Sequence, residues 1–219
     1  MATEETERAA ARRRNLADGT IDFTAMYATH DAFERDLRRL TEAVAAGRAQ
    51  APGVVAGWDS FKHQLHIHHT AEDATLWPAL RRKVTEPDEV EVIDAMEREH
   101  GRIDPLLAAV DAGFASGDQV GLAEAATEAA QALGGHMAHE EAAALPLIEA
   151  RLTKAEWNEF PRYSRKINSL SRGLEFLPWM LDEAEPELYQ SAMRILPAPA
   201  RGIYRRVMLP RYRRRAYWR

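Results

Sequence analysis

Apolar residues recur three or four positions apart along four long segments between about residue 22 and residue 150. This spacing places them on one side of an α-helix, so each segment is predicted to be an amphipathic helix that packs on its neighbours. No segment alternates steadily between apolar and polar residues, and no strand is predicted. The stripes contain Met26, His30, Phe33, Leu37, Leu40 and Val44; Trp58, Phe61, Leu65, His68, Glu72 and Leu76; Ile93, Met96, His100, Ile103, Leu107, Val110 and Phe114; and Leu122, Ala129, Leu133, His136, Glu140 and Leu147.

Short connections between the four segments indicate that consecutive helices are antiparallel. Gly47 and the Ser-Gly-Asp sequence at 116–118 mark helix ends. We therefore predict an all-α protein in which residues 20–152 form an up-down-up-down four-helix bundle. Residues 1–19 are predicted to be a leader, either a short polar helix or a frayed segment.

A C-terminal extension is predicted over residues 153–219. The sequence Thr153-Lys-Ala-Glu156 has the spacing of a capping box and predicts the start of a further helix. Beyond Phe160, six prolines divide the chain into short helical or irregular pieces, so a second bundle is not expected. These prolines are Pro161, Pro178, Pro186, Pro197, Pro199 and Pro210.

Composition narrows the chemistry. The 219 residues are 46% hydrophobic and 29% charged, which is typical of a globular protein. There is no cysteine, so disulfides, iron–sulfur clusters and cysteine nucleophiles are excluded, and any metal must be held by nitrogen and oxygen. No apolar run approaches the ~18 residues of a membrane-spanning helix, and residues 1–14 lack the apolar core of a secretory signal. A cytoplasmic location is expected.

The most informative pattern is a set of histidines and acids at stripe positions: His30, His68-x-x-x-Glu72, His100 and His136-x-x-x-Glu140. Residues four apart share one face of a helix, so all six side chains can converge on one axis of the bundle. A carboxylate can bridge two cations and an imidazole donates one nitrogen, which makes the two glutamates candidate bridges and the four histidines terminal ligands. Unpaired carboxylates on core faces are costly, and two cations would offset that cost.

The second and fourth helices repeat one another around these residues. Each reads His, then Glu four positions later, another acid, and Pro ten positions after the His. The repeat suggests a pseudo-twofold site with one metal in each half. A ferritin-type site would need Glu-x-x-His on two helices, and only Glu97-Arg-Glu-His100 meets that pattern. Imidazole with carboxylate suits iron, whereas manganese would favour more oxygen.

The remaining histidines receive different interpretations. His63, His66 and His69 lie off the apolar stripe and are expected on the surface or at its boundary. His139, one turn after His136, is left open as a residue that supports or replaces a ligand.

The sequence resembles the hemerythrin-like family, specifically bacterial domains with the motif H…HxxxE…H…HxxxE. The motif covers roughly residues 20–152 and includes His68-His69-Thr70-Ala71-Glu72-Asp73 and His136-Met137-Ala138-His139-Glu140-Glu141. The resemblance implies a four-helix bundle holding a non-heme di-iron centre bridged by two carboxylates and an oxo or hydroxo group.

Two positions depart from the oxygen-carrying members of that family. Those members have a second histidine one turn after the ligand of the third helix, where this chain has Asp104. Asp104 can bind weakly, accept a hydrogen bond from an imidazole, or leave a position to water. Their last acid lies five residues after its histidine, which would be Glu141, but the repeat with Glu72 favours Glu140.

The resemblance implies a protein that binds or responds to O2, NO or peroxide in redox or iron stress. The alternative is a di-iron enzyme that decomposes hydrogen peroxide or reduces nitric oxide. The ligand set does not separate the two, since both need an open coordination position, and whether the protein is an enzyme stays open at this point, as does its oligomeric state.

Charge is unevenly distributed. Residues 201–219 contain eight arginines and no acid, which leaves −13 on residues 1–200 out of a net −5 for the chain. Arginines interleaved with aromatic residues can bind nucleic acid or an anionic membrane surface. The favoured interpretation is that the tail folds back on the acidic bundle, and no nucleic-acid partner is expected. The apolar residues 177–181 are expected to cover the end of the bundle.

Overall fold

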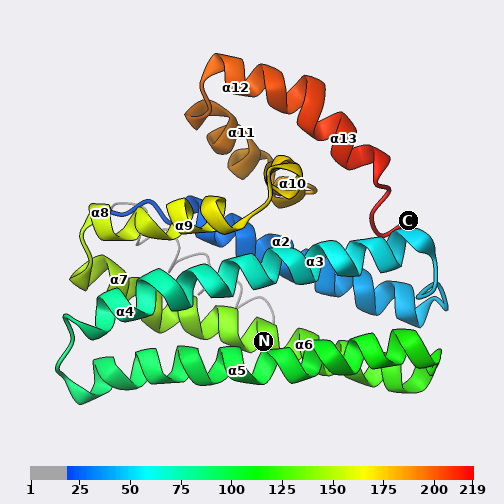
Figure 1. Ribbon diagram of the computed structural model, residues 1–219, viewed down its shortest axis with the longest axis horizontal. Coiled ribbons are helices and arrows are strands. Elements are labelled where there is room, and N and C mark those ends of the chain that lie inside the picture. Colours follow the sequence, from blue (N-terminus) through cyan, green and yellow to red (C-terminus); the bar gives the residue numbers. More distant parts are fainter. Residues whose placement is uncertain (1–18) are drawn as a thin grey trace.

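The computed structural model describes residues 19–219, which form helices joined by short turns and contain no strand (Figure 1). The all-α prediction is confirmed for this part of the chain. The leader predicted for residues 1–19 lies almost entirely outside the described residues.

Four long helical rods lie side by side (Figure 1). The helix α5 packs along α6, and α2 packs against both α6 and α3. The second and fourth rods are each built from an α-helix, a π-turn and a short second α-helix. The rods are α2 (Thr24–Ala45); α3 (Pro52–Ala71), η1 (Glu72–Leu76) and α4 (Trp77–Arg81); α5 (Pro87–Ser116); and α6 (Gln119–His139), η2 (Glu140–Ala144) and α7 (Leu145–Arg151).

Local sequence explains where the rods begin and end. Gly47 and Gly117 adopt φ of 67° and 71°, a left-handed conformation that costs glycine little, directly after α2 and α5. Asp118 accepts hydrogen bonds from two backbone amides at the start of α6. The predicted capping box at Thr153 and Glu156 is present and starts α8 (Lys154–Trp157).

Each π-turn is followed by a proline, although Pro105 of α5 and Pro178 of α10 lie within helices that have no π-turn. A helical proline has no N–H to donate, and its ring collides with the carbonyl four residues earlier. Widening the preceding turn by one residue relieves both problems. The three π-turns of the described residues each begin six residues before a proline, namely Pro78, Pro146 and, for η3 (Tyr204–Met208), Pro210.

The hydrophobic core is divided into two clusters. The first cluster includes Phe33, Phe61 and Leu133. The second cluster includes Met26, Leu76 and Ile148 and lies at the opposite end of the rods. In the second and third rods the predicted metal-binding residues lie between the stretches that supply the two clusters, and in the first and fourth rods His30 and His136 lie within the end of the first cluster that faces the second. A polar layer therefore crosses the middle of the bundle.

The extension continues as α9 (Glu159–Ile167), α10 (Leu170–Met180), α11 (Pro186–Ile195), α12 (Ala198–Ile203), η3 and α13 (Leu209–Arg214). Helix α9 packs on α3, and α10 packs on α2. The apolar residues Trp179, Met180 and Leu181 are buried in the first core cluster, so this patch covers the flank of α2, not the predicted bundle end.

A buried polar network fastens α10 to α2. The Arg35 guanidinium donates to Asp36 and to the backbone carbonyls of Trp179 and Asp182, and the Trp179 indole donates to Asp36 at 2.7 Å. Burial raises the pKa of Asp36, and Arg35 opposes this effect by favouring the carboxylate. Removing either partner would leave the other buried without compensation.

The C-terminus returns to the bundle. The Trp218 amide donates to the Gly53 carbonyl at 2.6 Å, and its ring occupies the space that a side chain at Gly57 would need. The tail therefore folds back as expected, but among the described residues its arginines pair with Glu175 of α10 and not with acids of the bundle. No helix of residues 19–219 combines the length and apolarity required to cross a membrane.

Candidate metal centre

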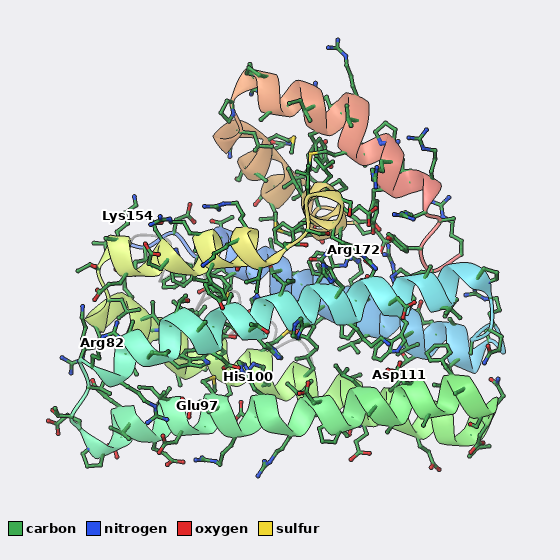
Figure 2. All side chains as sticks on the ribbon, in the orientation of Figure 1. Arg82, Glu97, His100, Asp111, Lys154 and Arg172 are labelled. Atoms are coloured by element: carbon green, nitrogen blue, oxygen red, sulfur yellow. The ribbon has the colours of Figure 1, made fainter. Side chains whose placement is uncertain are left out.

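The six predicted metal-binding residues meet inside the bundle, and four separate rods supply them. His30 comes from α2 and His100 from α5, where Figure 2 marks it between the ribbons of α3 and α5. His68 and His136 lie in the last turns of α3 and α6, and Glu72 and Glu140 are the first residues of the two π-turns. All six are buried; both glutamates are 0% exposed.

Potential ligand atoms gather in two groups. His30, His68 and Glu140 form one group, and His69, His100 and His136 form the other; within each group the ligand atoms lie within 4.8 Å of one another. Each group is the size of the coordination sphere of a single ion. The candidate ligands thus fall into two groups, and one metal in each half stays a prediction.

Glu72 lies between the two groups. Its Oε1 is 2.9 Å from His68 Nε2 in the first group, and its Oε2 is 3.6 Å from His100 Nε2 in the second. Glu140 Oε2 is 3.2 Å from His30 Nε2. One carboxylate with an oxygen directed at each half is the arrangement that a bridging ligand requires.

Several of these buried atoms lack a hydrogen bond. Within the described chain, the Nε2 atoms of His30 and His68 and all four carboxylate oxygens of Glu72 and Glu140 are shielded from solvent and make no hydrogen bond of acceptable geometry. Leaving one such group unsatisfied costs about 1–3 kcal/mol, and here four such groups meet at one point, which favours a further binding partner. Nitrogen and oxygen atoms that converge in this way could hold one or two cations.

The outward-facing imidazole nitrogens are held by carboxylates. Nδ1 of His30 lies 3.0 Å from Glu141, Nδ1 of His100 lies 2.8 Å from Asp73, and Nδ1 of His136 lies 2.9 Å from Glu99. Such contacts orient each ring so that its Nε2 faces the interior of the bundle, as in histidines that bind metals, and the Nε2 atoms of His100 and His136 lie 3.2 Å apart.

These contacts also show that Glu141 and His139 lie outside the two groups of potential ligands, although their neighbours Glu140 and His136 belong to them. Glu141 contacts the outer nitrogen of His30, whereas Glu140 points into the first group. His139 lies outside both groups and contacts Glu99 at 2.8 Å, so it shares the carboxylate that orients His136.

His69 lies at the boundary, as predicted, but the sequence interpretation did not include it among the ligands. It is half-buried, belongs to the second group, and stacks on His100 with ring centroids 4.0 Å apart. The reason is helical geometry: His69 and Glu72 are three residues apart, and this spacing shares a face as well as a spacing of four. His63 Nε2 forms a hydrogen bond with Asn168 Oδ1, and His66 is exposed; both lie at the surface or its boundary, as expected.

The position that departs from oxygen-carrying relatives lies outside both groups. Asp104 is exposed and belongs to neither set of potential ligands. It lines a pocket of about 450 Å³ that reaches His69 and His100 between α3 and α5. The other polar residues of this pocket are Lys62, His66, Thr70, Asp73 and Glu97, the last labelled in Figure 2.

The pKa values of His30 and Glu140 are shifted in opposite directions, so that both side chains are charged. Burial lowers the pKa of His30, but the carboxylates of Glu140 and Glu141 outweigh it and raise that pKa to about 9. Burial raises the pKa of Glu140, but His30 outweighs it and lowers that pKa to about 2. Without a cation, His30 and Glu140 therefore form a buried ion pair.

Glu72, His68 and His69 are held neutral. Burial, reinforced by the charge of Glu140, raises the pKa of Glu72 well above its ordinary value. Burial and neighbouring imidazoles lower the pKa values of His68 and His69 well below theirs. Neutral imidazoles have lone pairs available for a metal, and a cation would favour the carboxylate form of Glu72.

A helical fold with two groups of inward-facing imidazoles and acids defines a class of cation-binding protein with its site inside a bundle. Residues 21–148 match the family model described as the Hemerythrin HHE cation binding domain, and the chain belongs to this family. The family predicted from the motif is therefore confirmed. Neither the curated proteins nor the solved structures gave a match to this chain.

Proposed function

We propose that this protein holds two iron ions at the centre of an up-down-up-down bundle formed by residues 20–152. The observation that carries this proposal is the set of six buried, unbonded ligand atoms on His30, His68, Glu72 and Glu140. The turns of Figure 1 lie at alternating ends of the rods, which supports the up-down course.

The proposed ligands divide between two ions. His30 and His68 would hold one ion, His69, His100 and His136 would hold the other, and Glu72 and Glu140 would bridge them. With His69 the set contains five imidazoles, and His69 would take the place of the histidine that oxygen-carrying members have where this chain has Asp104. A set of imidazoles and carboxylates without sulfur suits iron, which would supply redox chemistry and open positions for small ligands.

We propose that the site binds or responds to O2, NO or peroxide. Rings of Phe33 and Phe160 lie 5.4 and 5.6 Å from the His68 ring and give one side of the site an apolar wall. Because Phe160 belongs to α9, the extension at 153–219 completes the surroundings of the proposed centre.

Peroxide decomposition is the second candidate, and the pocket at His69 and His100 favours it. A polar lining with Lys62, Thr70 and Asp73 can hydrogen-bond a polar ligand such as hydrogen peroxide and offers little to O2 or NO. In that activity these residues would orient peroxide and exchange its protons with solvent.

Metal analysis tests the proposed iron centre, and a turnover assay distinguishes binding from peroxide decomposition. Protein from iron-supplied cells should contain two irons per chain and show near-ultraviolet charge-transfer bands, and His68→Ala should lose both. Full-length protein that stays free of metal after reconstitution would overturn the centre. Oxygen evolution from peroxide that His68→Ala abolishes and His63→Ala, at a histidine outside the pocket, retains would favour the enzyme, and its absence in iron-loaded protein would favour binding.

A further inference from the structure

The segment formed by α12, η3 and α13, here called the basic arm (residues 198–214), lies on the side of the molecule away from α5 and α6 (Figure 1). Buried Tyr204 and Tyr212 hold its inner side against the rest of the chain. Its outer side is not used by the proposed metal centre.

Most of the charge of the basic arm is uncompensated. Arg211 interacts with Glu175 at 3.5 Å, and Arg215, just beyond the arm, does so at 3.0 Å. Four exposed arginines of the arm form no ion pair with any residue of 19–219, and the sequence from 201 onward offers no acid. These four are Arg205, Arg206, Arg213 and Arg214.

Two aliphatic side chains project beside these charges. Ile203 and Val207 are one turn apart and are 51% and 50% exposed, among the few large apolar residues so exposed in the described chain. A hollow of about 410 Å³ on the same arm is lined by Arg201, Arg205 and Arg206 and has room for an anionic group. Exposed aliphatics flanked by arginines are typical of surfaces that rest on lipid headgroups.

The orientation of the aromatic residues argues against nucleic acid. Stacking on single-stranded bases requires exposed rings. Here Tyr204, Tyr212 and Trp218 are 1%, 5% and 8% exposed, and the Tyr217 hydroxyl donates to Glu175. The arm therefore presents arginine and aliphatic side chains outward and keeps its rings inside.

We propose that the basic arm docks this protein on an anionic lipid bilayer. The arginines bind headgroup phosphates, with one headgroup in the hollow at Arg201, while Ile203 and Val207 enter the boundary between headgroups and acyl chains. The bundle, which carries negative charge, then faces away from the membrane.

Vesicle sedimentation of the full-length protein tests the proposal. The protein should bind phosphatidylcholine vesicles that contain about 30% phosphatidylglycerol, and it should dissociate from them as the salt concentration rises toward about 0.5 M. It should not bind vesicles of pure phosphatidylcholine. Arg205→Glu/Arg206→Glu should weaken binding by about 25-fold or more. Ile203→Ser/Val207→Ser, which retains every charge, should also weaken it.

The control is Arg82→Glu/Arg102→Glu, which makes the same charge change at exposed positions on the bundle (Figure 2 labels Arg82). It should bind as the parent does, and circular dichroism should show that all variants are folded. The proposal is overturned if anionic vesicles are not bound, if both arginine pairs weaken binding equally, or if Ile203→Ser/Val207→Ser has no effect. Salt-dependent binding of DNA without binding of vesicles overturns it as well.

Discussion

Replacing Glu72 by methionine should stabilise the metal-free protein and abolish its stabilisation by iron. The carboxyl group of Glu72 is fully buried, and neither oxygen makes a hydrogen bond of acceptable geometry in the described structure. Methionine has a similar length, no group that needs solvation, and a flexible shape that fits irregular space. The substitution therefore removes an unsatisfied polar group from the core without opening a cavity.

The magnitude follows from the burial of that group. An unsatisfied buried polar group costs about 1–3 kcal/mol, so the free energy of unfolding of metal-free Glu72→Met should rise by a similar amount. For a protein of this size, each kcal/mol raises the melting temperature by about 2–4 °C. Iron at 100 times its dissociation constant should stabilise the parent by about 2.7 kcal/mol and the variant by far less.

Thermal and urea unfolding, followed by far-ultraviolet circular dichroism with chelator or with iron, measure both effects. Glu72→Gln is the matched comparison, because it also removes the bridging carboxylate but keeps two buried polar atoms and should gain no stability. Glu128→Met, at an exposed position of α6, should change the free energy of unfolding by less than about 0.5 kcal/mol. A metal-free Glu72→Met that unfolds more easily than the parent, or one that keeps the full response to iron, would refute the reasoning.

Three further outcomes are expected. His69→Ala should lower the affinity for the second iron by more than about tenfold in metal titrations while His66→Ala leaves it unchanged, and equal effects would contradict the assignment of His69. Asp36→Asn should lower the free energy of urea unfolding by about 3–5 kcal/mol because the charge of Arg35 stays buried without its partner, and a loss below about 1 kcal/mol would argue against the buried network. Hydrogen bonds from Lys83 and from Thr153 lower the pKa of Glu156 to about 2, so the unfolded chain takes up this proton at a higher pH than the folded one. The parent should therefore lose more thermal stability than Glu156→Gln between about pH 5 and about pH 3, and parallel losses would show that the pKa is not lowered.

The sequence alone determined the helical class and the residue types that gather at the candidate site. Apolar spacing identified the four rods, Gly47 and Gly117 marked their ends, and the capping box located the start of the extension. These features depend on contacts between residues close in the chain, and such contacts follow from helical geometry. The ligand types followed in the same way, because a buried acid on an apolar stripe requires compensation wherever the helix packs.

Only the tertiary structure showed which neighbours of the stripe residues also face the centre. The apolar stripe, a face about 100° wide, placed His68 inside and His69 beside it, and the structure showed that His69 also turns inward, where it stacks on His100. Glu140 and Glu141 are likewise both buried, and their different partners on opposite nitrogens of His30 assigned them different roles. The course of the C-terminal tail depended on contacts between residues far apart in sequence, such as Trp218 with Gly53, and no local pattern specifies those.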